Sequence, residues 1–161
     1  MKHAPLPASI WRDPMMLLAC GLGSGTARFA PGTFGTLVAL PLYWLIADLS
    51  ILHYTLLTVL LFLVGIGLCE YTSKKLGVHD HPGIVWDEIV GYLVTMFMAP
   101  AGIVWMLVGF MLFRLFDIWK PWPIRWLDAK VAGGFGIMID DVLAGIYAAA
   151  LLQLLYYWWP Y

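Results

Sequence analysis

Two pairs of adjacent acidic residues stand out in a chain that is otherwise mostly apolar. Asp87 and Glu88 precede the apolar stretch that begins at Ile89, and Asp140 and Asp141 precede another. One acid at a helix start is explained by capping or by the helix dipole, but each of these positions carries two. Grouped carboxylates are the ligands that hard cations prefer. The four acids are therefore candidate metal ligands, with helix capping as the structural alternative.

A second group of charges lies at i, i+3 and i+6 in the segment FRLFDIWK, as Arg114, Asp117 and Lys120. Arg114 and Asp117 share one face of a helix. The helix dipole disfavours an acid near a helix C-terminus, so capping does not explain Asp117. An ion pair between Arg114 and Asp117 would neutralise both charges. The functional hypothesis makes Asp117 a metal ligand and catalytic group. Phosphate binding is then assigned to Arg114, Lys120 and Arg125, because cationic side chains bind phosphate oxygens.

The polar loop 74–88 carries His79, Asp80 and His81. Two histidines this close lack the i, i+4 spacing of a helical zinc site and have no cysteine partners. His79 and Asp80 are candidate catalytic groups for proton transfer, with His81 as an alternative to His79. Asp80 could also bind a metal, and hydrogen bonding within the loop is the structural alternative.

Glycines recur in the segment 21–36, GLGSGTARFAPGTFGT. Glycine lets backbone N–H groups approach an anion, as in phosphate-binding loops. The spacing fits neither the P-loop nor the dinucleotide-binding pattern. Close helix packing is an equally good interpretation, and the glycine and proline density predicts that no continuous helix covers this segment.

The composition identifies the class of protein. The chain has 161 residues, of which 62% are apolar and 12% charged, whereas soluble domains have about 45–50% apolar and about 25% charged residues. We expect an integral membrane protein with one domain, residues 1–161, and an N-terminal tail, residues 1–13. The net charge of −1 suggests no nucleic-acid partner. The apolar run before Cys20 is shorter than a signal peptide needs, so no removable signal is expected.

The apolar stretches predict an all-α polytopic fold with about five membrane-associated helices in the lipid bilayer. A short helix is also expected at 14–19. The predicted spans cover residues 34–52, 54–70, 84–99, 103–119 and 142–159. The third span is short and could be re-entrant.

Lysine and arginine occur only in alternate connections between these spans. The positive-inside rule then places the N-terminus in the cytoplasm. It also brings the glycine-rich segment 21–36, the loop 74–88 and the stretch 114–141 to the cytoplasmic face, so all candidate groups converge there.

Several carboxylates without a thiolate set favour Mg²⁺ or Mn²⁺ over zinc. Neighbouring arginine and lysine favour a phosphorylated substrate, and such a cation would activate water and stabilise charge on the phosphoryl oxygens. The alternatives are an ion-coupled membrane transporter that uses buried acids, and a non-catalytic scaffold. A transporter predicts acids near the middle of the membrane and an internal repeat, whereas these acids gather at one face.

Four segments closely resemble the phosphatidylglycerophosphatase A family: GLGSGTARFAPGTFGTLVALPL, VHDHPGIVWDEIVG, FRLFDIWKPWPIRWLD and GGFGIMIDDVLAG. The similarity runs from about residue 15 onward. It implies an all-helical, Mg²⁺-dependent lipid phosphatase of the bacterial inner membrane. The implied reaction converts phosphatidylglycerophosphate to phosphatidylglycerol and phosphate in phospholipid synthesis. The residues that the resemblance marks as metal or acid–base candidates are Asp80, Asp87, Glu88, Asp117, Asp140 and Asp141.

The sequence lacks the S-R-x-x-x-x-x-H and S-G-H patterns of type 2 phosphatidic acid phosphatases. A phosphohistidine intermediate is therefore not expected.

Overall fold

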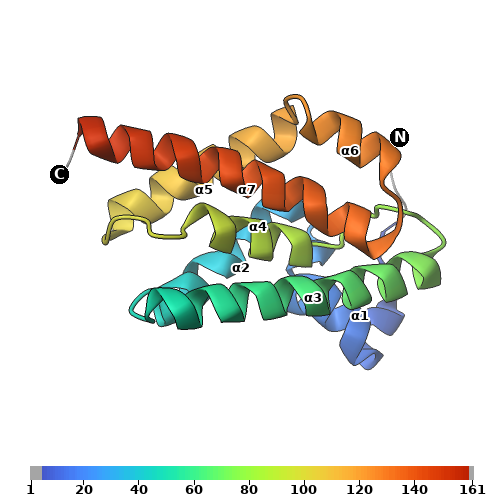
Figure 1. The fold of residues 1–161 in the computed structure, drawn as a ribbon. Coiled ribbons are helices and arrows are strands. Elements are labelled where there is room, and N and C mark those ends of the chain that lie inside the picture. Colours follow the sequence, from blue (N-terminus) through green and yellow to red (C-terminus); the bar gives the residue numbers. More distant parts are fainter. Residues whose placement is uncertain (1–4, 160–161) are drawn as a thin grey trace.

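The computed structural model describes residues 5–159, and within this range every regular element is a helix (Figure 1). The all-α prediction is confirmed. The elements, in chain order, are η1 Ala8–Arg12, α1 Pro14–Ala19, η2 Gly21–Thr26, α2 Pro31–Ile46, α3 Ile51–Leu76, α4 Trp86–Thr95, α5 Ile103–Trp119, α6 Ile124–Lys130 and α7 Gly133–Trp158.

Helix α7 is the centre of the packing, with α3, α4 and α5 against it (Figure 1). Its buried positions Ala144, Ala148 and Leu152 belong to the main apolar core, together with Tyr92 of α4 and Phe113 of α5. Small residues on α7 allow a close approach to α4. A Cβ added at Gly145 would lie 3.0 Å from Cβ of Val94 on α4. This packing fixes α7 and α4, and with them both acidic pairs.

Among the described residues, α3 and α7 are the helices long and apolar enough to cross a membrane by length and composition. Each has 26 residues and so is about 39 Å long at 1.5 Å per residue, more than the ~30 Å hydrocarbon layer. The outer face of α3 exposes a run of leucine and valine side chains, and large exposed apolar faces mark interaction with a membrane or a partner. The fold is consistent with membrane association.

The element boundaries partly match the predicted spans. The predicted helices at 14–19 and 103–119 are confirmed as α1 and α5. Predicted span 34–52 is found as the shorter α2, which starts at Pro31, a favourable residue for the first turn. Predicted span 54–70 extends to Leu76, and predicted span 84–99 contains only the ten-residue α4.

The prediction that Asp140 and Asp141 open the last span is wrong, because α7 already begins at Gly133. The two acids therefore lie about two turns inside the helix. Gly133 and Gly134 form the first turn of α7, and this start of the helix packs closely on α3. A side chain at Gly134 would overlap the carbonyl of Ile66 and lie 2.8 Å from Cβ of Glu70.

The segment 21–36 contains η2 and the start of α2 rather than one helix, as expected. Of the predicted tail, residues 1–4 lie outside the described residues, and residue Ile10 in η1 is fully buried. Asp13 caps α1 by accepting hydrogen bonds from the amides of Met15 and Met16.

The Asp13 side chain also fastens the N-terminal segment to α3. It accepts hydrogen bonds from Lys75 at 2.5 Å and from the Tyr71 hydroxyl at 2.9 Å. The Lys75 hydrogen bond is the main reason that the pKa of Asp13 falls to about 2.

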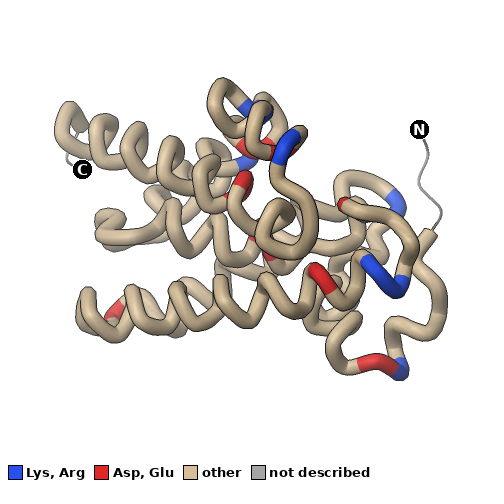
Figure 2. The backbone as a smooth tube through the Cα atoms, turned by 45° about the vertical axis from the view of Figure 1, so that its right-hand side comes forward, with Lys and Arg blue, Asp and Glu red and all other residues tan. Residues whose placement is uncertain are grey.

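Charged residues gather in one half of the molecule (Figure 2). That half contains the start of α7 and the end of α5, while the half that contains the C-terminus is almost free of charge (Figures 1 and 2). The helices thus bring the charged segments to one end, as the loop pattern predicted.

Candidate active site

A cavity of about 270 Å³ opens at the charged end, between the start of α2, the loop before α4, α4 itself, the end of α5 and α7. Its polar lining comes from segments far apart in the sequence. The charged lining residues are Asp80, Asp87, Glu88, Arg114, Asp117, Lys120, Asp140 and Asp141. The sequence assigns eight charged residues to metal or phosphate binding. Seven of them line this cavity together with Asp80, and Arg125 does not.

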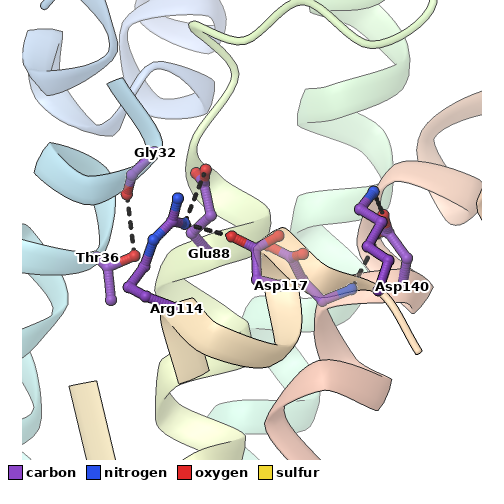
Figure 3. Close-up of polar contacts among 8 residues, drawn as sticks. Gly32, Thr36, Glu88, Arg114, Asp117 and Asp140 are labelled. Atoms are coloured by element: carbon purple, nitrogen blue, oxygen red, sulfur yellow. Dashed lines mark hydrogen bonds and ion pairs between the residues drawn. The ribbon is translucent and has the colours of Figure 1, made fainter. Parts of the chain in front are cut away.

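Three of these acids form a group with the geometry of a cation site. Glu88 of α4, Asp117 of α5 and Asp141 of α7 each direct one carboxylate oxygen so that these atoms lie within 4.8 Å of one another. Figure 3 shows Glu88 and Asp117 approaching from separate helices. Three helices must pack correctly to form this group, so it is a property of the fold rather than of any one segment.

Several carboxylate oxygens of the cavity residues have no hydrogen-bond partner within the described range 5–159. They are Oδ1 of Asp87, Oε2 of Glu88 and Oδ2 of Asp141, all buried. A buried polar atom without a partner is costly and unusual in a folded protein. An all-oxygen donor set of this kind suits Mg²⁺ or another hard cation, so the residues present fit the metal that the sequence suggests.

Capping does not account for the acidic pairs. The residue at the N-cap of α4 is Val85, with no side-chain cap, and Asp87 and Glu88 lie in the first turn. Asp140 and Asp141 lie inside α7, where the amide of Asp141 donates to Oδ1 of Asp140 at 3.0 Å. Both pairs instead direct carboxylate oxygens into the cavity wall.

Arg114 lies between two of the acids (Figure 3). Its Nη1 forms an ion pair with Asp117 and lies 3.6 Å from Oε1 of Glu88, whereas its buried Nε has no hydrogen-bond partner among the residues that the structure describes. The expected Arg114–Asp117 ion pair is present, and Asp117 still belongs to the carboxylate group. Arg114 therefore holds the two acids in place beside the cavity.

Gly32 makes room for this arrangement on the α2 side (Figure 3). A Cβ at this position would overlap Oε1 of Glu88 and lie 3.1 Å from Nη1 of Arg114. The hydroxyl of Thr36 donates to the Gly32 carbonyl at 2.9 Å. The glycine-rich segment thus contributes a close approach to the site at Gly32.

Lys120 joins three helices at the cavity. It ends α5 in the left-handed conformation, with φ of 44°, which is uncommon for a residue with a side chain. Its Nζ lies 2.5 Å from Oδ2 of Asp140 on α7 and 3.2 Å from Oδ1 of Asp128 on α6. Burial lowers the pKa of Lys120, but Asp140 and its neighbouring carboxylates outweigh burial, so the pKa rises and the side chain stays charged.

In the loop before α4, Asp80 lines the cavity, whereas His79 and His81 do not. Loss of surrounding water raises the pKa of Asp80, Lys120 opposes this rise, and Asp128 adds to it. His79 instead accepts a hydrogen bond from the amide of Gly133 at 2.8 Å, outside the cavity lining.

The other two predicted residues also lie apart from the cavity. His81 is buried and its Nδ1 accepts from the Gly83 amide at 3.0 Å. Arg125 is exposed on α6 and does not line the cavity. The sequence analysis does not single out Asp128 or Glu70. Asp128 forms an ion pair with Lys120, and Glu70 accepts a hydrogen bond from the start of α7. The only sequence signal for either residue is the charge of Asp128 within the stretch 114–141.

The fold and the cavity define a class: an all-helical protein with long apolar helices, whose carboxylates and paired cations suit phosphate chemistry. The family comparison gives the same class. Residues 17–156 match the model of phosphatidylglycerophosphatase A, so the chain belongs to this family and is a phosphatase. This result favours the phosphatase hypothesis over the transporter and scaffold alternatives.

Curated relatives cover most of the chain. A phosphatidylglycerophosphatase A of Escherichia coli (strain K12) is 46% identical over 149 residues, 92% of this chain and 87% of the relative. One from Haemophilus influenzae is 46% identical over 159 residues, 98% of both chains. A Bacteroides thetaiotaomicron protein, provisionally named phosphatidylinositol-3-phosphatase, is 37% identical over 145 residues, 85% of this chain and 90% of the relative. No solved structure matches the chain.

Proposed function

We propose that this phosphatase removes the terminal phosphate of phosphatidylglycerophosphate, giving phosphatidylglycerol and inorganic phosphate in phospholipid synthesis, and that it requires Mg²⁺. The observation that carries the proposal is the group formed by Glu88, Asp117 and Asp141, with Arg114 beside it. Two of the relatives are named for this substrate. A phosphate monoester carries two negative charges near neutral pH, and the cavity offers cations to match them.

Glu88, Asp117 and Asp141 would hold the Mg²⁺, and the unpartnered oxygen of Asp87 lies in the same cavity wall. Asp140 supports this group through its ion pair with Lys120. When bound, Mg²⁺ supplies charge stabilisation at the phosphoryl oxygens and lowers the pKa of water.

Arg114 and Lys120 bind and orient the phosphate. Arg114 lines the cavity, and a guanidinium suits the planar geometry of phosphate oxygens. Lys120 is held at the rim by Asp140 and Asp128, so its charge is in place before substrate arrives. Such preorganised charges favour the transition state because they need not rearrange during reaction.

Asp80 is the cavity residue available for proton transfer. Hydrolysis breaks the bond between phosphorus and the glycerol oxygen, a water oxygen joins phosphorus, and the leaving oxygen takes up a proton. Asp80 lines the same cavity as the acids of α5 and α7, and a carboxylic acid in that position can donate the proton that this step needs.

The apolar surface supports a location in the bacterial inner membrane, with the cavity at the cytoplasmic face. We propose that α2, α3, α5 and α7 cross or enter the hydrocarbon layer and that α4 is the short third element. Helix α4 is about 15 Å long, and the irregular segment 96–102 continues the chain to the start of α5. The aromatic side chains of Trp119, Trp122 and Trp126 are exposed near the site, where they would lie at headgroup depth.

Phosphate release by the purified full chain tests the proposal. We expect release from phosphatidylglycerophosphate in mixed micelles with Mg²⁺, and much slower release from phosphatidylinositol 3-phosphate. Faster release from the inositol lipid would overturn the substrate assignment. Release that is unchanged in Asp117→Asn would overturn the assignment of the site.

A further inference from the structure

Helix α7 begins without a capping side chain of its own. Its N-cap residue is Ala132, which makes no side-chain cap, and its first residues are Gly133 and Gly134. The first amides of a helix have no partner within the helix and need one from elsewhere. The position of this helix start matters for the site, because α7 carries two of the cavity acids.

Two side chains from distant parts of the chain supply these partners. The amide of Gly133 donates to Nε2 of His79 at 2.8 Å, and the amide of Gly134 donates to Oε2 of Glu70 at 2.5 Å. Glu70 lies on α3 and His79 in the loop after it. Accepting through Nε2 leaves the proton of a neutral imidazole on Nδ1.

The backbone of α7 is shaped for this double cap. Gly133 adopts φ of +79°, and a Cβ there would lie 2.7 Å from Oε2 of Glu70. At Gly134 a Cβ would lie 2.8 Å from both Cβ and N of Glu70. A residue larger than glycine at Gly134 would push α7 away from the backbone of α3, and one at Gly133 would displace the Glu70 carboxylate from its amide partner, so both glycines are needed for the two capping contacts.

The double cap connects two walls of the cavity. His79 is adjacent to Asp80, which lines the cavity, and α7 carries Asp140 and Asp141 about two turns beyond the capped amides. We infer that Glu70 and His79 are positioning residues that fix the start of α7, and the loop of Asp80, relative to the cavity. This inference deepens the proposed function, and the activity measurements that test it rest on that function.

The inference assigns His79 a role different from proton transfer, and substitution by glutamine separates the two roles. Gln can place an amide oxygen where Nε2 lies but cannot shuttle a proton. A helix cap stabilises by about 1 kcal/mol, so a displaced start of α7 can lower the rate by up to about 5- to 10-fold, whereas loss of a general acid or base costs about 10²–10⁴-fold. We expect His79→Ala to lower kcat about 5- to 10-fold with little change in KM, and His79→Gln to stay within about twofold of wild type.

Glu70→Ala and Glu70→Gln form the parallel pair, with the same expected loss and rescue. Lys74→Ala is the matched control. Lys74 contacts Glu70 at 2.7 Å on the surface, and within the described part of the chain it makes no hydrogen bond or ion pair with α7. The control should keep wild-type kcat.

Amide hydrogen exchange of residues 133–136 in the full chain, in micelles, tests the cap without any substrate. Exchange should accelerate about tenfold in His79→Ala and Glu70→Ala, and not in the glutamine variants. Unchanged exchange in both alanine variants overturns the inference, as does a His79→Gln variant that exchanges like wild type yet loses activity at least a hundredfold. A wild-type chain that releases no phosphate from phosphatidylglycerophosphate would refute the proposed function instead, while the exchange result still decides the cap.

Discussion

Replacing Gly32 with alanine adds one methyl group to the wall of the cavity and removes no functional group. The added Cβ would overlap Oε1 of Glu88, lie 3.0 Å from its Cδ and 3.1 Å from Nη1 of Arg114. The carboxylate is the far end of a flexible side chain, so the fold can adapt while Glu88 moves by on the order of 1 Å. A displacement of this size at a catalytic group costs about 10²-fold in rate.

We therefore expect Gly32→Ala to lower kcat for phosphate release about 100-fold while the melting temperature stays close to that of wild type. Gly67→Ala is the matched control. Gly67 also lies in a helix, but apart from its own stretch of helix no atom of the described residues lies within 4 Å of the position its Cβ would occupy. This control should keep full activity and gain up to about 1 kcal/mol from the helix preference of alanine.

The assay measures released phosphate at saturating Mg²⁺ and substrate, with a thermal melt of each variant. Full activity of Gly32→Ala would refute the claim that Glu88 must hold its present position. A large fall in melting temperature would show instead that α2 cannot absorb the change.

Three further perturbations follow from the buried charges. Asp141→Asn should reduce phosphate release at least about 100-fold without lowering the melting temperature, because a neutral amide is easier to bury than an unpartnered carboxylate; an active, stable variant contradicts this. Lys120→Met leaves the buried Asp140 without its cation and should destabilise the chain by about 3 kcal/mol, and adding Asp140→Asn should restore most of this in denaturant unfolding. The pKa of Asp13 is lowered to about 2, so its ion pair with Lys75 contributes stability above about pH 4 and loses it as the pH falls toward 2. Amide exchange of residues 14–19 at pH 7 and pH 2.5 checks this, and equal protection would count against it.

Local patterns in the sequence were sufficient for much of the fold. The long apolar run at Ile103–Trp119 ends with a charged turn, and it forms α5 with the same bounds. The acids and cations of the site could also be recognised, because an ionisable residue in an apolar chain has few structural explanations. Grouped charges of this kind point to a site even before their neighbours are known.

The remainder depends on contacts between distant segments. The predicted last span begins at residue 142, whereas α7 already begins at Gly133; glycine disfavours helix interiors, and the close packing of Gly134 against α3 is visible only in the structure. For the same reason nothing in the local pattern distinguished His79, which contacts α7, from Asp80, which lines the cavity. Tertiary packing decided the outcome in each case.

The proposed requirement for Mg²⁺ is tested most directly by phosphate release from phosphatidylglycerophosphate before and after chelation. Wild-type chain in micelles should release phosphate with Mg²⁺, lose this activity in excess EDTA and regain it when Mg²⁺ is restored. Asp117→Asn and Asp141→Asn should stay inactive throughout. Undiminished release in EDTA, or full release by both variants, would contradict a metal-dependent site built from Glu88, Asp117 and Asp141.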